Sequence, residues 1–191
     1  YLSTFPLSAT TVIIKYLTIF EVTNSNGDSI GVLLNGARMG DDNDVFLLTS
    51  TYDLYIINLS EDMHPMHIHL VNFQRYKEAP LNVTRYSADW QALNGGPPPY
   101  KPAVNQTVKP LVPDLPSNTY LTDQWVMLDG INRVWRDTDY VKPGYVSVLR
   151  FRFTMNDGTP FKGTTRLGKY VMHCHMLEHE DNEMMRYFTV R

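Results

Sequence analysis

Apolar and polar residues alternate along several short segments of the chain, which are rich in Val, Ile, Tyr, Phe and Thr. A period of two is typical of β-strands that bury one face, and turn-forming pairs such as Asn35-Gly36 and Pro143-Gly144 separate the segments. Many short strands divided by turns predict an all-β fold of the β-sandwich type. We expect strands over residues 11–21, 30–34, 52–59, 67–76, 145–154, 169–175 and 185–190.

The alternation fails between about residues 79 and 120. The run from Gly95 to Pro99 reads Gly-Gly-Pro-Pro-Pro, and further prolines at positions 80, 102, 110, 113 and 116 exclude a central strand. Loops of this length are often functional or flexible, so the segment either borders a substrate pocket or decorates the surface. Decoration is the simpler interpretation. We therefore predict one domain over residues 1–191 that carries a long Pro-rich surface insertion.

Charge and hydropathy exclude several classes of partner. The 22.0 kDa chain has a formal net charge of -3 and no block of like charges, so neither nucleic acid nor an anionic membrane is an expected partner. No segment approaches the roughly 18 uninterrupted apolar residues of a membrane span. The chain opens on Tyr1 without a basic and then apolar leader, so we expect a processed start, with any signal peptide removed or lying upstream.

Three Asn-x-Ser/Thr sequons, at Asn58, Asn82 and Asn105, would accept glycans in a secretory pathway. Such triplets also arise by chance, but together they favour a secreted or extracellular glycoprotein. The single cysteine, Cys174, excludes a disulfide within these 191 residues, so its presence needs another explanation.

Histidine and cysteine are confined to two short clusters. All six histidines and the only cysteine lie in His64-Pro65-Met66-His67-Ile68-His69 and His173-Cys174-His175-Met176-Leu177-Glu178-His179, and Met184 follows five residues later. Taken singly, a histidine or methionine would be an ordinary core residue and the cysteine an inert one. Taken together, they indicate a metal site. A Cys with two His and a weakly held Met is the ligand set of a blue copper centre, whereas a zinc site would not need the Met.

Strand geometry divides these residues between two sites. Successive side chains of a strand point to opposite faces, so His173 and His175 should project one way and Cys174 the other. One strand would then serve two metal sites, and electrons could pass from the sulfur through the backbone to both imidazoles. His67 and His69 likewise share a face and would join His173 and His175. The first site would be completed by His64, His179 and Met184, whereas Met185 is expected to be an ordinary core residue.

These motifs closely resemble the C-terminal cupredoxin domain of multicopper oxidases, the family of laccases, bilirubin oxidases, spore-coat laccases and multicopper ferroxidases. The first cluster resembles the family's HPxHxH motif, and residues 173–184 resemble its HCHxxxHxxxxM motif. The likeness is strongest to the spore-coat laccase and bilirubin oxidase branch, whose Leu-Glu-His-Glu-Asp run matches residues 177–181. The resemblance covers most of the chain apart from the insertion, and it implies a cupredoxin-like Greek-key β-sandwich.

The resemblance also implies roles for the residues. In this family the blue copper oxidises a small reducing substrate and passes electrons to a trinuclear copper cluster, which reduces dioxygen to water. Glu180 matches an acidic residue that helps to deliver protons near the cluster, although a solvated surface carboxylate is an equally simple interpretation. The implied blue-copper ligands are His64, Cys174, His179 and Met184, and the implied cluster ligands are His67, His69, His173 and His175.

The family's cluster takes its remaining ligands from N-terminal cupredoxin domains, and this chain has no spare histidine to supply them. We therefore expect a fragment, covalently linked or nicked, of a complete oxidase that acts on phenols, pyrroles, amines or metal ions. Electrons would reach the blue copper at the exposed edge of His64 or His179. Glu61 and Asp62 could attract a cation there, but a solvated loop is the simpler interpretation. The alternatives are a stand-alone cupredoxin electron carrier and a copper-free β-sandwich with a storage, defence or binding role.

Overall fold

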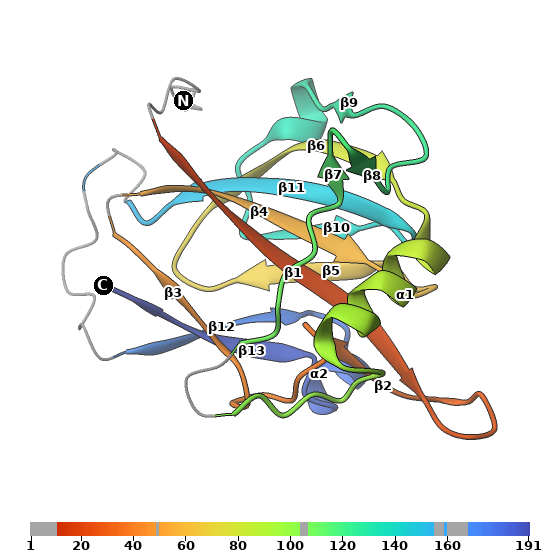
Figure 1. Cartoon of the computed structure of the whole chain (residues 1–191). Coiled ribbons are helices and arrows are strands. Elements are labelled where there is room, and N and C mark those ends of the chain that lie inside the picture. The colour runs from red at the N-terminus through yellow and green to blue at the C-terminus, as the bar shows by residue number, and fades with distance from the viewer. Residues whose placement is uncertain (1–10, 49, 104–106, 155–158, 160–167) are drawn as a thin grey trace.

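The computed structural model describes residues 11–48, 50–103, 107–154, 159 and 168–191. Two β-sheets pack face to face as a sandwich, and the long strand β1, which belongs to the first of them, runs diagonally through the view (Figure 1). The first sheet has the order β2 (Ser29–Leu34), β1 (Val12–Thr23), β4 (Thr51–Asn58), β11 (Tyr145–Arg152), β6 (Phe73–Pro80) and β9 (Val126–Met127). The second has the order β10 (Thr138–Val141), β5 (His64–Ile68), β12 (Lys169–Cys174), β13 (Met185–Val190) and β3 (Asn43–Phe46).

The main core lies between the two sheets. Phe46 packs its ring edge-on against Phe151 of the first sheet and Phe188 of the second, with centroids 5.7 and 5.4 Å apart. Cys174 and Met184 belong to the same buried cluster. The inner face of the second sheet is therefore apolar, and it contains the sulfur atoms of both residues.

The expected single strand over residues 67–76 is wrong, because the chain changes sheets within it. β5 ends at Ile68 in the second sheet and β6 begins at Phe73 in the first. Between them Leu70 has a φ of 71°, a left-handed backbone conformation that a strand cannot contain. The resulting corner brings the histidine-rich strand β5 beside β12 rather than beside β11.

The Pro-rich insertion is more than surface decoration, contrary to the simpler expectation. It contains α1 (Val83–Asn94), which begins after the capping side chain of Asn82 and ends at Gly95 in the left-handed conformation. The helix buries Tyr86 and Trp90, and Trp90 stacks on Phe20 of β1 at 5.6 Å. The insertion therefore forms a second apolar core on the outer face of the first sheet. It also holds the short hairpin of β7 (Asp114–Leu115) and β8 (Asn118–Thr119).

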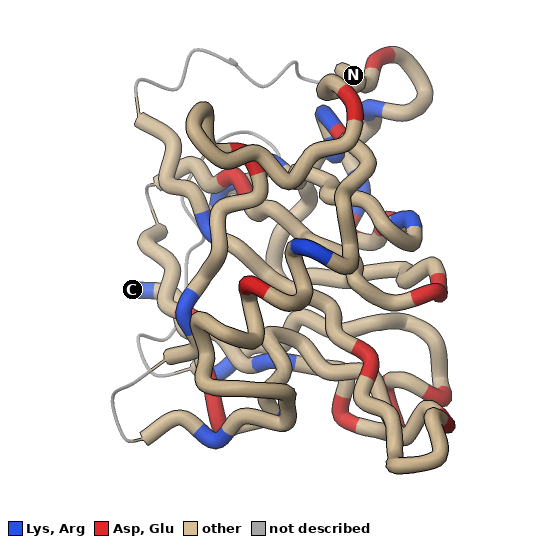
Figure 2. The backbone as a smooth tube through the Cα atoms, turned by 45° about the vertical axis from the view of Figure 1, so that its right-hand side comes forward, with Lys and Arg blue, Asp and Glu red and all other residues tan. Residues whose placement is uncertain are grey.

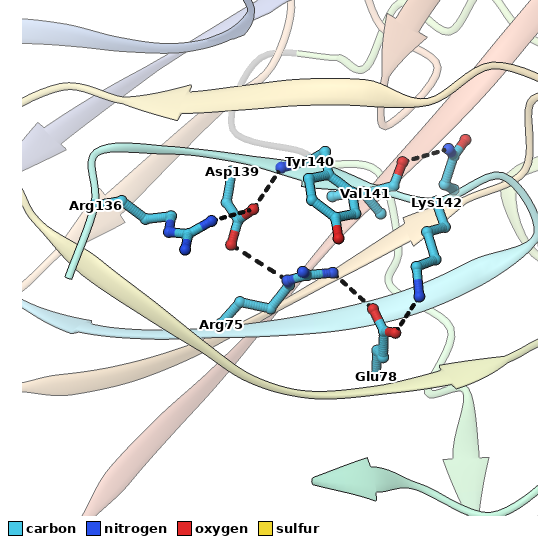
Figure 3. A network of polar contacts seen from close by, with 8 residues as sticks. Arg75, Glu78, Arg136, Asp139, Tyr140, Val141 and Lys142 are labelled. Carbon is cyan, nitrogen blue, oxygen red and sulfur yellow. Dashed lines mark hydrogen bonds and ion pairs between the residues drawn. The ribbon is translucent and has the colours of Figure 1, made fainter. Parts of the chain in front are cut away.

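Buried ion pairs tie the edge strand β10 to the first sheet (Figure 3). Arg75 of β6 lies between Glu78, whose Oε2 accepts from Nη1 at 2.7 Å, and Asp139 of β10, whose Oδ2 is 3.2 Å from Nε. Arg136 and Lys142 reach the same two carboxylates from the partly exposed side. Since β10 pairs with β5 over four residues, this network fixes the strand that neighbours the first histidine cluster.

Two short helical segments complete the described chain: α2 (Leu177–Asp181) and the 3-10 helix η1 (Gly130–Arg133). Among the residues that the structure describes, none of the helices is long and apolar enough to cross a membrane. Lys and Arg are spread over the backbone among Asp and Glu (Figure 2).

Candidate metal centre

The two clusters meet where β5 lies beside β12. In this antiparallel pair His67 is opposite His173, and Met66 is opposite Cys174. Met66, Ile68 and Cys174 lie in the buried core, so the alternation of β5 and β12 directs His67 and His173 to the outer face of the second sheet. The sheet therefore separates a thiol on its inner face from imidazoles on its outer face.

On the inner face, the thiol lies between two imidazoles. Sγ of Cys174 is 3.7 Å from Nδ1 of His64, the first residue of β5, and 3.7 Å from Nδ1 of His179 in α2. Transition-metal bonds of about 2.3 Å to sulfur and about 2.0 Å to nitrogen, opened by roughly 110–120°, place the two donors roughly 3.5–3.7 Å apart. Both distances from the sulfur match a shared ion, and the three donor atoms all lie within 4.8 Å of one another.

Burial favours the neutral forms of His64 and Cys174. It lowers the pKa of His64 to about 4, an effect strengthened by the neighbouring His179. It also raises the pKa of the Cys174 thiol, despite the Met176 amide that donates to its sulfur. Nearby Lys or Arg usually activates a nucleophilic cysteine, whereas a buried thiol between two imidazoles suits a metal ligand better.

Met184 is fully buried and follows α2. Its backbone N–H donates to the carbonyl of His179 at 2.9 Å, and its own carbonyl accepts from the N–H of Cys174 at 3.1 Å. The backbone therefore places Met184 beside two of the three inner donors. Met185, which we expected in the core, is only half-buried where β13 begins opposite His173.

Four imidazoles gather on the outer face. The ring centroid of His67 is 5.0 Å from that of His69, 5.4 Å from that of His173 and 5.2 Å from that of His175. One ring nitrogen each of His67, His69 and His173 lie within 4.8 Å of one another. Burial, followed by the three neighbouring imidazoles, lowers the pKa of His69, which favours the neutral form that binds metals. His69 and His175 are the exposed members of the group.

On two of these rings, Nδ1 takes part in hydrogen bonds and Nε2 has no hydrogen-bond partner among the described residues. Nδ1 of His67 lies 2.9 Å from both the Asp137 carbonyl and the Thr138 hydroxyl, and Nδ1 of His173 lies 3.0 Å from the Cys174 carbonyl. Metal-binding histidines usually donate through their second nitrogen in this way. Nε2 of both rings is therefore available to a ligand. Nothing in the sequence pattern had indicated Asp137 or Thr138.

Carboxylates approach the site from α2 and from the loop before β5. Oε2 of Glu180 is 3.5 Å from Nδ1 of His173, so it lies beside the imidazole group rather than in bulk solvent. Glu61 and Asp62 are both exposed. Of the two imidazoles beside the thiol, His64 has no exposed surface and His179 is half-buried. The exposed edge that we expected at His64 or His179 can therefore belong only to His179.

The three sequons differ in exposure. Asn58 has no exposed surface, and its Nδ2 donates to the carbonyls of Asp62 at 2.7 Å and Val141 at 3.2 Å. The expected glycan at Asn58 is therefore incompatible with the folded protein. Asn82 is exposed at the start of α1, and Asn105 lies outside the described residues.

The chain is similar in sequence to proteins of known family. The Multicopper oxidase family profile matches residues 14–191. A multicopper oxidase LPR1 homolog 1 from Oryza sativa subsp. japonica is 28% identical over 177 residues, which are 90% of this chain and 28% of the relative. A laccase from Bacillus subtilis is 31% identical over 156 residues, 81% of this chain and 23% of the relative. The chain thus spans about a quarter of the length of these relatives.

Solved structures confirm the predicted cupredoxin-like fold. The McoA multicopper oxidase of Aquifex aeolicus superposes with a TM-score of 0.58 at 16% identity, over 98% of this chain and 31% of that one. A multicopper oxidase from Campylobacter jejuni, described as a metallo-oxidase, superposes with a TM-score of 0.56 at 22% identity, over 94% of this chain and 30% of that one. With the family profile covering all but the first thirteen residues, the chain belongs to the multicopper oxidase family.

Proposed function

We propose that this chain is the C-terminal copper-binding domain of a laccase-like oxidase, which oxidises a small reducing substrate and reduces dioxygen to water. His64, Cys174, His179 and Met184 hold a blue copper, and His67, His69, His173 and His175 hold part of a trinuclear copper cluster. The proposal depends on one observation: a thiol 3.7 Å from two imidazole nitrogens, with four more imidazoles on the opposite face of the same sheet. Bound copper supplies one-electron transfer at the first site and dioxygen reduction at the second.

The chain's own residues provide the path of electron transfer. His179 is the partly exposed donor of the inner site, so the substrate contacts the protein there. Peptide bonds join Cys174 directly to His173 and His175, which gives a short covalent path from the inner to the outer site. Substrates that can give up one electron at such an edge include phenols, pyrroles, amines and metal ions.

Glu180 is the residue for proton delivery. Dioxygen reduction consumes protons, and a general acid must lie within hydrogen-bonding reach of the site or one water away. The Glu180 carboxylate is half-buried and 3.5 Å from His173, which supports its role as the group that holds and passes a proton at Oε2.

The remaining cluster ligands come from N-terminal cupredoxin domains of the same oxidase. The exposed positions of His69 and His175 support this, because both can meet a second domain. The fraction of each relative that the chain spans, 28% for the Oryza protein, leaves room for such domains. We also propose that the oxidase is secreted, with Asn82 as a glycan site. Enzymatic deglycosylation of native material followed by intact-mass measurement tests this point.

Copper content, the visible spectrum and oxygen uptake test the function. The copper-loaded protein should show the intense visible band of a copper–thiolate bond. Cys174→Ser should abolish that band even though His179 is unchanged, because the band requires the thiolate. A full band without oxygen uptake in the presence of the N-terminal domains would favour the electron carrier instead. Absence of stoichiometric copper under replete conditions would refute the proposal.

A further inference from the structure

A row of buried polar side chains lies behind His64, on the side away from Cys174. Nε2 of His64 is 2.6 Å from Oγ of Ser60, and Oγ of Ser60 donates to Oδ1 of Asn58 at 2.8 Å. Ser60 is 4% exposed, and Asn58 and His64 are fully buried. Buried polar groups without partners are costly, so the order of donors and acceptors in this row is constrained.

The orientation of the Asn58 amide fixes that order. Its Nδ2 donates to two carbonyls, those of Asp62 and Val141, so its Oδ1 must be the atom that faces Ser60. Oδ1 accepts from both the N–H and the hydroxyl of Ser60, at 3.0 and 2.8 Å. The other acceptor near the hydroxyl, the Asp62 carbonyl, is farther away at 3.4 Å.

Ser60 therefore has a lone pair, and not a proton, to offer His64. The imidazole must donate from Nε2, which leaves the lone pair of Nδ1 directed at the Cys174 sulfur 3.7 Å away. Asn58 ends β4 of the first sheet, and the Val141 carbonyl belongs to the residue that pairs with His64 in the second sheet. The row thus connects the first sheet to one inner-site donor.

We propose that Ser60 and Asn58 are positioning residues for the inner metal site, which hold His64 in the tautomer and ring orientation that present Nδ1 beside Cys174. The inference rests on the proposed copper centre. Without the row, the ring can turn about its Cβ–Cγ bond or take the other tautomer, and either change removes Nδ1 as a donor. Loss of such an outer partner typically weakens metal binding by about 10–100-fold.

Ser60→Ala tests the role in the copper-loaded protein. Titration with a competing copper chelator, followed through the copper–thiolate band, should show copper affinity at the inner site lowered by about 10–100-fold. Ser147→Ala is the matched control, because Ser147 is equally buried and its Oγ has no hydrogen-bond partner in the described part of the chain. That variant should keep the affinity of the unsubstituted protein. A purely structural role for Ser60 would lower the unfolding midpoint and leave the affinity of the folded protein unchanged.

Imidazole nitrogen NMR of the unsubstituted, metal-free protein gives a second measurement that needs no variant. His64 should carry its proton on Nε2, and that proton should exchange slowly because it is buried and donated to Ser60. A proton on Nδ1, or an affinity of the Ser60→Ala variant within twofold of the unsubstituted protein, would overturn this inference and leave the copper centre standing. Absence of the thiolate band from the unsubstituted protein would overturn both.

Discussion

Replacing Asp139 by Asn isolates the contribution of one buried charge to the fold. The side chain of Asp139 is 1% exposed and that of Arg75 is 2% exposed, so neither charge is hydrated by bulk water. Asn keeps the size of the side chain and an oxygen for the Tyr140 N–H, which donates to Oδ1 at 2.9 Å. Asp139→Asn therefore removes the charge and replaces the Oδ2 acceptor beside Arg75 by an amide NH2, with little change in side-chain size.

The expected loss follows from the geometry of the network. Two unit charges 3.2 Å apart attract by roughly 5 kcal/mol at an effective dielectric constant of 20. Arg75 retains Glu78, but Glu78 is shared with Lys142, so a buried guanidinium is left only partly compensated. Breaking such a buried pair costs about 3–5 kcal/mol. In a protein of this length the melting temperature should fall by roughly 6–20 °C.

Urea unfolding of the metal-free protein, followed by circular dichroism, measures this loss. Arg38→Gln is the control, because it breaks the Arg38–Glu183 pair, whose side chains are 64% and 48% exposed and whose charges are 3.6 Å apart. Exposed pairs contribute about 0–1 kcal/mol, so the control should unfold almost like the unsubstituted protein. If Asp139→Asn unfolded within 1 kcal/mol of the unsubstituted protein (about the upper limit for an exposed pair), the network would not stabilise β10 as argued.

Three further substitutions probe other parts of the molecule. Met184→Leu should keep the visible band and raise the reduction potential, because a weak axial donor is lost; redox titration measures it, and an unaltered potential would exclude Met184 as the axial ligand. Trp90→Ala should destabilise the protein by about 3–5 kcal/mol in urea, whereas a loss near zero would mean that the α1 core is not cooperative with the sandwich. Burial opposes the charge of Asp44, yet Arg186 and Lys15 hold its pKa below the ordinary 3.8. As the pH falls, Asp44 is therefore protonated in the unfolded chain before it is protonated in the folded chain, and stability is lost as the pH falls through the lowered pKa. Asp44→Asn should therefore reduce the dependence of stability on pH in the acid range.

Sequence alternation predicted the strands whose two faces differ in polarity, and the structure confirms most of them. It missed β10, because Asp139 is buried there and its charge is compensated in part by Arg75, which comes from a distant strand. α1 was also missed, although Asn82 and Gly95 are ordinary signals for the two ends of a helix. The neighbouring prolines masked those signals, and only two residues of the helix are buried.

Some features of the site follow from neighbouring residues in the sequence, whereas others depend on residues far apart in it. The opposite orientation of Cys174 and its neighbours follows from strand geometry alone, and the structure places them accordingly. The roles of Asn58 and Ser60 depend on which carbonyls surround the Asn58 amide, and one of these belongs to Val141, 83 positions away. A pattern of neighbouring residues cannot predict a contact between residues so far apart in the sequence.

The pairing of β12 with β5 also restricts the insertions and deletions that β12 can tolerate. A one-residue deletion within β12 ahead of His173 would turn the Cys174 thiol outward and the His173 imidazole inward, so a single change would remove one ligand from each site. A two-residue deletion would restore the facing of His173 and Cys174 but displace both donors by about 7 Å along the strand, roughly three times the length of a coordination bond. Insertions and deletions in homologous genes should therefore be absent from this strand and concentrate in the loops.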